Sequence, residues 1–486
     1  MTIARKLPQR GDPAWALAAW PEDAPLVALW SAPTSAGTDP RWSRWTVLGR
    51  PVGGVCLTAA DSPRLGRVHG FGQAGLRGGT DGAAVDPLVL LRELVDRTRL
   101  QRAPARANDA PPFVGGWIGC LHYELGRVVE PAAGIGSARP GATLMVWQRC
   151  PAAYAHDRRT GCWWAVGDER AVRTLPPLEF QPPGEDEFRC VAARPEESEA
   201  EYRRAVERTV EYIRAGDVFQ ANISHALASR FSGSSRSFFA ALMERAAPWY
   251  GAYIEHGDPA SSNAIVSASP EMFIELDPRT RAVTTRPIKG TRRAAGEGEN
   301  ELASSVKDAA ELAMIVDLMR NDLGRVCEYG SIRVIDPRAL ERHGAPSATA
   351  TDAGVIHGVA TVTGRLRNDR DLVDLLRAAF PGGSITGAPK VRAMQIIDGL
   401  EQRPRGPYTG SIGYISDCGR ACFNIAIRTA SLHQPSAWTR PGWFDDARLE
   451  YPVGAGIVAE SDPAQEWDET LAKADIIRTL DRAPLA

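Results

Sequence analysis

The chain has 486 residues, 44 % of them hydrophobic and 24 % charged, and a formal net charge of −2 at pH 7. This length exceeds what one hydrophobic core usually organises, so we expect two domains, or one large elaborated one, with the composition of an ordinary globular protein. Because the charges are balanced and no basic face is interleaved with aromatic side chains, we exclude a polyanion-binding class and expect no nucleic-acid partner.

Neither a targeting segment nor a membrane span is expected from the sequence. Residues 1–8 lack the apolar core of a signal peptide. The most apolar helical run, residues 312–319, is interrupted by Asp317 and is too short to cross a bilayer. The eight cysteines include no Cys-x-x-Cys pair, so we expect reduced thiols and a cytoplasmic protein.

The amino-terminal region, residues 1–190, is predicted to mix short strands with one clear helix. Residues 26–30 and 45–48 are strand-like runs between Gly and Pro breaks. Residues 87–102 carry leucines and a valine along one helical face. The glycines of residues 113–120 indicate a strand that another backbone approaches closely.

A polar, Pro-rich stretch, residues 175–197, is the best candidate for a boundary before the second region, residues 195–486. Ser198 with Glu201 three residues later is a capping box, so we expect a helix to begin there. Residues 218–223 are then expected to form a strand. Strands and helices alternate to the end without a Gly-rich dinucleotide-binding turn or a repeat, which favours an α+β fold with mostly antiparallel sheet.

The stretch from Thr285 to Arg292 contains the most distinctive candidate for chemistry, Lys289. Pro287 stiffens the backbone before it, and Gly290 after it permits a close approach. A strand-like run, residues 272–276, precedes the stretch, so we expect Lys289 at the end of a strand, where reactive side chains are often displayed. A solvated lysine beside a turn is the plain alternative for this stretch alone.

Two predicted helices each bring a pair of carboxylates to one surface. Asp308 and Glu311 lie three residues apart beside an apolar stripe. Near the carboxyl terminus, Glu466, Glu469 and Lys473 share one face of a second helix. Oxygen ligands from two such pairs suit Mg²⁺, whereas either pair alone could be a solvated helix face.

Three further segments are candidates for contact with a ligand. Residues 381–390 form a Gly-rich loop that opens a helix, and its amides could hold a carboxylate, although a plain loop fits equally well. The small-residue run Gly454–Gly456 lets either a substrate or a second strand approach its backbone. Arg428, in an expected apolar strand over residues 424–430, needs an anionic partner if it is buried, and that partner could be a substrate or a structural carboxylate.

Taken together and in this order, these residues resemble the chorismate-utilising enzymes over roughly residues 198–480. The motifs that carry the resemblance are Ser267–Glu271, Arg286–Thr291, Met314–Asp322, Pro381–Arg392, Gly410–Tyr414 and Glu466–Thr470. The amino-terminal part is similar to the family's smaller partner region through residues 112–127. In carrying lysine at position 289, the chain resembles component I of the aminodeoxychorismate synthases, whereas the sibling anthranilate synthases carry alanine there.

The resemblance implies a fold of large, mostly antiparallel β-sheets packed face to face, with helices on the outside. It also implies the conversion of chorismate and ammonia to 4-amino-4-deoxychorismate, a precursor of 4-aminobenzoate and folate. Lys289 would attack C2 of chorismate, and Glu271 would protonate the departing C4 hydroxyl. Glu311 and Glu466 would hold Mg²⁺ directly, and Asp308 and Glu469 would help through waters.

The resemblance further implies a set of substrate-binding residues. These are Gly290, His357, Thr386, Gly387, Tyr408, Arg428, Gly454, Ala455, Gly456 and Lys473. His357 departs from the family pattern in one respect, because Gly358 rather than leucine follows it.

The source of ammonia is expected outside this chain. No Gly-x-Cys-x-Gly elbow of a glutaminase surrounds Cys120 or Cys418, so we expect a separate glutamine amidotransferase subunit. Gln220 stands where the isochorismate and salicylate synthases carry a water-activating lysine, which disfavours water as the nucleophile. Two alternatives stay open: an anthranilate synthase component I in which Lys289 is a bystander, and a non-catalytic paralogue that binds chorismate or the amidotransferase.

Overall fold

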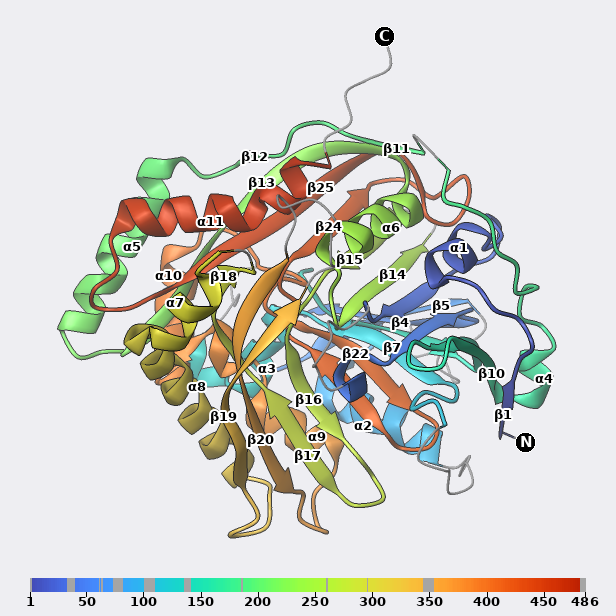
Figure 1. Ribbon diagram of the computed structural model, residues 1–486, viewed down its shortest axis with the longest axis horizontal. Helices are drawn as coiled ribbons and strands as arrows, with labels where there is room; N and C mark the ends of the chain where they lie inside the picture. The colour runs from blue at the N-terminus through green and yellow to red at the C-terminus, as the bar shows by residue number, and fades with distance from the viewer. Residues whose placement is uncertain are drawn as a thin grey trace.

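The computed structural model describes the chain except for residues 1, 33–39, 61, 63, 73–81, 100–109, 135–140, 185–186, 259–260, 295, 344–353 and 481–486. The described residues form two antiparallel sheets, of 13 and 12 strands, with helices around them (Figure 1). No helix of this described part is both long and apolar enough to cross a membrane.

The strands of the first sheet, in spatial order, are β1 (Thr2–Lys6), β10 (Cys162–Asp168), β9 (Ala152–Asp157), β3 (Trp45–Gly49), β2 (Val27–Trp30), β14 (Gly251–Asp258), β15 (Ser261–Ser267), β24 (Thr429–Gln434), β25 (Trp443–Ile457), β13 (Gln220–Ser234) and β11 (Phe188–Cys190), while β12 (Arg194–Pro195) and β21 (Gly387–Ala388) also pair with β13. The second sheet runs β18 (Ile288–Arg293), β20 (Val355–Arg365), β17 (Ala282–Arg286), β16 (Met272–Leu276), β23 (Ala421–Asn424), β22 (Ser411–Ser416), β7 (Gly116–Leu121), β8 (Thr143–Cys150), β4 (Gly53–Ala59), β5 (Gly66–Gly72) and β6 (Ala84–Val85), and β19 (Arg333–His343) also pairs with β20.

The α-helices are α1 (Pro13–Ala18), α2 (Pro87–Arg99), α3 (Gly126–Val129), α4 (Glu169–Val172), α5 (Glu199–Arg214), α6 (Ser235–Ala246), α7 (Gly298–Ser304), α8 (Val306–Gly324), α9 (Leu372–Ala379), α10 (Lys390–Leu400) and α11 (Pro463–Arg478). Short 3₁₀ turns are η1 (Pro40–Ser43), η2 (Tyr123–Leu125), η3 (Pro131–Ala133) and η4 (Gly383–Ile385). Helix α11 lies across β13 and β25, and α8 flanks β19 and β20 (Figure 1).

A hydrophobic cluster between the sheets draws side chains from both of them. Val47, Ile254 and Ile265 come from the first sheet, and Ile118 and Val146 come from the second. Because the inward faces of the two sheets share this core, the predicted fold of face-to-face antiparallel sheets with outer helices is confirmed.

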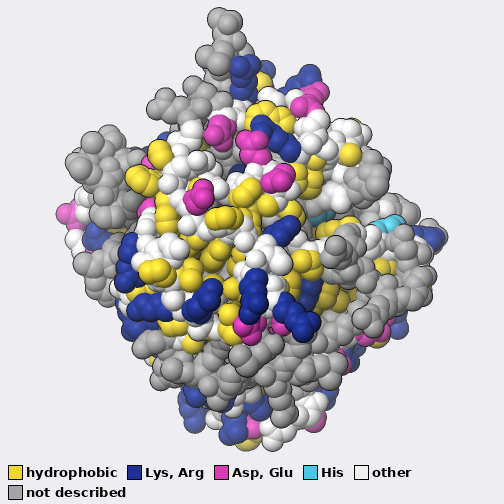
Figure 2. All heavy atoms as spheres, turned by 90° about the vertical axis from the view of Figure 1, so that its right-hand side faces the viewer, with side chains coloured by type: hydrophobic (Ala, Val, Ile, Leu, Met, Phe, Trp, Pro, Cys, Tyr) yellow, Lys and Arg dark blue, Asp and Glu magenta, His cyan; other side chains and the backbone are white. Residues whose placement is uncertain are grey.

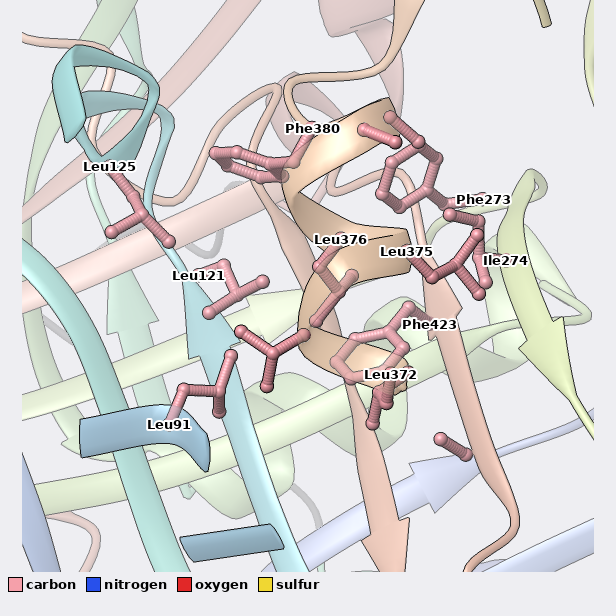
Figure 3. Close-up of a cluster of buried hydrophobic side chains, with 14 of the residues drawn as sticks. Leu91, Leu121, Leu125, Phe273, Ile274, Leu372, Leu375, Leu376, Phe380 and Phe423 are labelled. Atoms are coloured by element: carbon pink, nitrogen blue, oxygen red, sulfur yellow. The ribbon is translucent and has the colours of Figure 1, made fainter. Parts of the chain in front are cut away.

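The outer face of the second sheet is covered by α9. Its leucines, with Phe380 just after the helix, lie among Leu121, Phe273 and Phe423 from three strands (Figure 3). The rings of Phe273 and Phe380 meet edge to face with centroids 6.4 Å apart. Burial of several large side chains at about 1.5–3 kcal/mol each fixes the start of β16, next to Glu271.

Both sheets contain strands from residues 1–190 and from residues 195–486. Strand β2 pairs with β14 in the first sheet, and β7 pairs with β22 in the second. The candidate boundary, residues 175–197, includes β11 and β12, which pair with β13. The two predicted regions therefore share their sheets, and their division into domains stays a prediction.

Several local predictions can be compared with the elements. The capping box is present, because Ser198 Oγ accepts from the Glu201 amide and Glu201 Oε2 accepts from the Ser198 amide. The helix predicted over residues 87–102 is observed as Pro87–Arg99, and residues 100–102 lie outside the described part. The strand predicted at 218–223 begins at Gln220 and continues to Ser234.

One face of the molecule combines a broad apolar area with charges of both signs. Figure 2 shows hydrophobic side chains across its middle, Lys and Arg side chains along the lower half and Asp and Glu side chains above. This mixture of charges does not test the expected absence of a nucleic-acid partner, which stays a prediction.

Candidate active site

Lys289 is the second residue of β18, which pairs with β20. The prediction that it ends a strand is wrong, because Pro287 separates β17 from a new strand that begins at Ile288. Gly290 has φ of +78° and lies where the pairing register shifts. A Cβ on Gly290 would come within 2.9 Å of Asp308 Cγ, so only glycine fits between this strand and α8.

The amine of Lys289 is largely buried and only loosely paired. Its Nζ lies 3.8 Å from Oε2 of Glu311, and it makes no hydrogen bond within the described part of the chain. A Cβ on Gly456 would lie 3.0 Å from Nζ, so the lysine approaches bare backbone of β25. Burial lowers the pKa of Lys289, the Glu311 carboxylate opposes this shift, and Lys473 adds to it.

Glu271 directly precedes β16 and is 4 % exposed. Ser384 Oγ in η4 donates a hydrogen bond to its Oε1 at 2.7 Å. Burial raises the pKa of Glu271 to about 7, against the opposing effects of the Ser384 hydrogen bond and the Lys289 charge. Glu271 can therefore carry a proton near neutral pH, as a general acid must.

Of the four predicted metal-binding carboxylates, Asp308 and Glu469 have the closer ion-pair partners. Asp308 Oδ2 accepts a hydrogen bond from Nη2 of Arg292 at 3.0 Å. Glu469 Oε1 pairs with Lys473 Nζ at 2.7 Å. The same Lys473 ammonium donates to the carbonyl oxygen of Gly454 at 2.9 Å, which ties α11 to the small-residue run of β25.

The other two carboxylates are Glu311, which pairs with Lys289 at 3.8 Å, and Glu466, which accepts a hydrogen bond from Ser461. Lys307 at the start of α8 lowers the pKa of both Glu466 and Glu469, so the ends of α8 and α11 are close. Burial raises the pKa of Glu466, a sign that a nearby cation would stabilise its ionised form. Among the described residues, no three side chains of His, Cys, Asp and Glu form a ready metal-binding group. Oxygen donors of this kind fit Mg²⁺ in their chemistry.

Arg428 lies in a turn with φ of +50°, between β23 and β24. The strand predicted over residues 424–430 is therefore wrong, because β23 ends at Asn424 and β24 begins at Thr429. Burial lowers the pKa of Arg428, and no carboxylate of the described chain is paired with it. A buried guanidinium in this state suits a two-pronged contact with a ligand carboxylate.

His357 lies near Arg428, whereas Tyr408 lies near Arg405 and Glu401. The Arg428 charge is among the causes that lower the pKa of His357, after burial and His343. His357 Nδ1 is 2.8 Å from Thr291 Oγ1, whereas its Nε2 is buried without a partner in the described chain. Burial raises the pKa of Tyr408 to about 12.

The Gly-rich segment 381–390 is more structured than a plain loop, since it contains η4 and β21. Thr386 makes one hydrogen bond within the segment and one to β13. Its Oγ1 donates to the Gly382 carbonyl, and its own carbonyl accepts from the Asn222 amide. Gly387 has φ of +145°, and a Cβ there would come within 2.1 Å of the Gln220 carbonyl oxygen. The segment is thus bound tightly beside Gln220.

Within the run Gly454–Gly456, Gly456 and the side chain of Ala455 have different surroundings. Gly456 faces Lys289 and Gln220, as the contacts of its missing Cβ show. The side chain of Ala455 lies in a separate cluster with Trp467 under α11, so only its backbone can serve a ligand.

Two residues of this site were not singled out from the sequence. Ser384 lies in the Gly-rich segment, but nothing in a linear sequence links it to Glu271, 113 positions away. His343 stacks on Trp249 and contacts His357, and the sequence offered no spacing that would have found it.

A model of the chorismate-binding enzymes matches residues 75–479. The chain belongs to this family. It is 37 % identical over 407 residues to the aminodeoxychorismate synthase component 1 of Klebsiella aerogenes, covering 81 % of this chain and 83 % of that protein. It is 34 % identical over 419 residues to the anthranilate synthase component 1 of Cereibacter sphaeroides, covering 81 % of this chain and 78 % of the relative.

The fold of this family member also resembles a solved relative. The crystal structure of anthranilate synthase component I from Streptococcus pneumoniae matches with a TM-score of 0.69 and 26 % identity, covering 92 % of this chain and 94 % of that one. The chain is therefore a chorismate-utilising enzyme by family, which agrees with the resemblance stated from its motifs.

Proposed function

We propose that the chain converts chorismate and ammonia to 4-amino-4-deoxychorismate, as an aminodeoxychorismate synthase component I. The observation that carries the proposal is Lys289: a buried amine, without a hydrogen bond in the described chain, held against Gly456 and near Glu311. Since only about one amine in 2,500 is neutral at pH 7 for an unperturbed lysine, the lowered pKa of Lys289 favours the form that can attack.

The proposed reaction begins with attack of the Lys289 amine on C2 of chorismate. The ring double bonds shift, the C4–oxygen bond breaks, and Glu271 gives its proton to the departing hydroxyl, which leaves as water. Ammonia then bonds to C4, the lysine is released from C2, and its excess proton passes to solvent. Glu271 is suited to its step because its pKa of about 7 keeps a proton available near neutrality.

We further propose that the enzyme uses Mg²⁺. Glu311 and Glu466 would hold it, with Asp308 and Glu469 beside them. When bound, Mg²⁺ would neutralise a substrate carboxylate and draw electron density from the ring. The pairing of Asp308 with Arg292 and of Glu469 with Lys473 supports secondary roles for these two carboxylates.

Chorismate would be held by the substrate-binding residues that the resemblance implies. Arg428 and Tyr408 would take the enolpyruvyl carboxylate, while Lys473 and the Gly290 amide would assist at the ring carboxylate. The backbone of Gly454, Ala455 and Gly456 and the segment with Thr386 and Gly387 would line the site. His357, through its free Nε2, would lie beside the ring.

Ammonia would come from a separate glutamine amidotransferase subunit. The relatives' names as component 1 support a multi-subunit enzyme. We also propose a cytoplasmic location and a product used for 4-aminobenzoate and folate.

Anthranilate synthase component I is the second candidate. It is favoured by the 34 % identity to the Cereibacter sphaeroides protein, close to that of the first relative. The two candidates differ in their product and in the expected role of Lys289.

Mass spectrometry of the products from chorismate, Mg²⁺ and ammonium tests the proposal, for the wild type and for Lys289→Ala. We expect aminodeoxychorismate from the wild type and its loss, or replacement by anthranilate, in the variant. Anthranilate from the wild type would support the second candidate. No turnover, even with an added amidotransferase, would support a non-catalytic paralogue.

A further inference from the structure

The residue His343, at the end of β19, is enclosed by aromatic and imidazole rings. Its ring stacks on Trp249 with centroids 3.8 Å apart and an interplanar angle of 16°. It also meets the ring of His357 edge to face, with centroids 4.9 Å apart and an interplanar angle of 84°. The stack on Trp249 fixes the plane of the His343 ring. The edge contact with this fixed ring then restricts the orientation of the His357 ring.

His357 is thus held from two sides. In β18, Thr291 is its cross-strand partner and its Nδ1 neighbour at 2.8 Å. Across the other edge of β20, Glu341 is its cross-strand partner, and His343 follows two residues later on the same face of β19. With Nδ1 engaged by Thr291 and the ring braced by His343, Nε2 is the atom left for a ligand.

The contribution of His343 comes from its ring and not from hydrogen bonds of its nitrogens. His343 is 3 % exposed, and neither ring nitrogen has a partner in the described part of the chain. In the described part of the chain its acidic neighbour is Glu341, whose Oε2 is 3.9 Å from Nε2 and beyond hydrogen-bond distance. Because a buried polar group without a partner is unfavourable, an apolar ring would fill the place at lower free energy.

Burial, and after it the nearby positive charges, keep His343 from acting as a cation. Burial lowers the pKa of His343 to about 3, and Arg428 and Arg286 act in the same direction. Glu341 is engaged by Arg286, whose guanidinium donates to its Oε1. The contact between His343 and His357 is therefore one between neutral rings.

We propose that His343 is a positioning residue of the chorismate site, which braces His357 so that its Nε2 stays available to the substrate. The proposal rests on the proposed role of His357 in chorismate binding. It adds a residue that touches no substrate itself and acts through its neighbour.

A double-mutant cycle on chorismate affinity tests this, with the dissociation constant measured by calorimetry in the presence of Mg²⁺. We expect His343→Ala to weaken binding by about tenfold in the wild-type background. In a His357→Ala background the same change should have almost no further effect. His343→Phe, which keeps a flat ring, should restore affinity to within about threefold of wild type.

The matched control is His156→Ala in β9. His156 is also a buried histidine, 7 % exposed, with an unpartnered Nδ1 and a ring 4.9 Å from Trp163. We expect it to lower the melting temperature without changing chorismate affinity.

Three outcomes would overturn the proposal: equal weakening by His343→Ala in both backgrounds, no weakening in a folded His343→Ala protein, or no chorismate binding by the wild type. If the wild type binds chorismate but forms anthranilate, the proposed function fails while the cycle still decides the role of His343. The two failures are therefore distinguishable.

Discussion

Two buried lysines of this molecule have opposite surroundings. Lys390, at the start of α10, donates to Asp322 Oδ2 at 2.7 Å and to the Ala379 carbonyl at 2.8 Å. Among the described residues, the carboxylate paired with Lys289 is 3.8 Å away, and burial lowers the pKa of the lysine. The comparison teaches that burial alone does not make a lysine reactive: a close, bonded carboxylate stabilises the ammonium, whereas a distant one leaves the neutral amine within reach.

The largest expected effect is on the reaction rate, and it should distinguish Lys289 from Lys390. Lys289→Met should reduce the rate of chorismate amination by about 10³-fold or more, because the attacking amine is removed. Its free energy of unfolding should not fall, since an incompletely compensated buried amine is replaced by an apolar chain of similar length. Product formation and urea unfolding measure both quantities, and a rate within tenfold of wild type would contradict the role given to Lys289.

Lys390→Met should affect the stability of the protein rather than its reaction. It leaves the 3 % exposed Asp322 without its bonded cation, so the free energy of unfolding should fall by about 3–5 kcal/mol. Urea unfolding measures the loss. Adding Asp322→Leu should recover most of it, because the whole pair is then apolar, and no recovery would contradict this account.

Glu271→Gln should reduce kcat by about 10²-fold, because the variant has no proton to donate. In the wild type, kcat should fall as pH rises through about 7, since the acid form of Glu271 is then lost. That fall should be absent from the residual activity of the variant. Initial rates from pH 5.5 to 9 test this, and an unchanged profile would assign the titration to another group.

The same carboxyl should affect stability with a definite sign. The pKa of Glu271 is raised from 4.5 to about 7 by folding, so between these values the native state binds more protons than the unfolded state. Its contribution to stability is therefore present at low pH and is lost as pH rises across that window. Glu271→Gln should flatten the pH dependence of unfolding there, and a parallel dependence in both proteins would contradict the raised pKa.

The smallest expected effect is steric. Gly456→Ala would bring a Cβ to 3.0 Å from Lys289 Nζ and 2.5 Å from Gln220 Nε2, so kcat/KM should fall by about tenfold as the amine is displaced. Gly399→Ala is the control, because no described atom beyond its own stretch of helix lies within 4 Å of its added Cβ. Steady-state kinetics measures both, and equal kinetics for Gly456→Ala and wild type would show that Lys289 can move aside freely.

The sequence predicted what depends on local pattern or on long motifs. The Ser198–Glu201 capping box, the strand at residues 272–276 and the antiparallel α+β class are all confirmed. Arg428 shows the limit of pattern alone: the apolar run around it is strand-like, and only its φ of +50° reveals the turn.

Partners that meet only in three dimensions could not be predicted. Asp308 was expected to act with Glu311, but Arg292 from β18 engages it. Likewise, the pairing of Ser384 with Glu271 brings η4 to the residue before β16 and has no signal in their spacing.

The pairing of β7 with β22 has a consequence for how the protein is made. Leu121 lies opposite Ser411, so the second strand of the pair leaves the ribosome long after the first. Translation adds about 5–20 residues per second, so β7 is without this partner strand for roughly 15 to 60 s. During that interval the nascent chain exposes an apolar strand with an open edge, so we expect it to need protection from association with other chains.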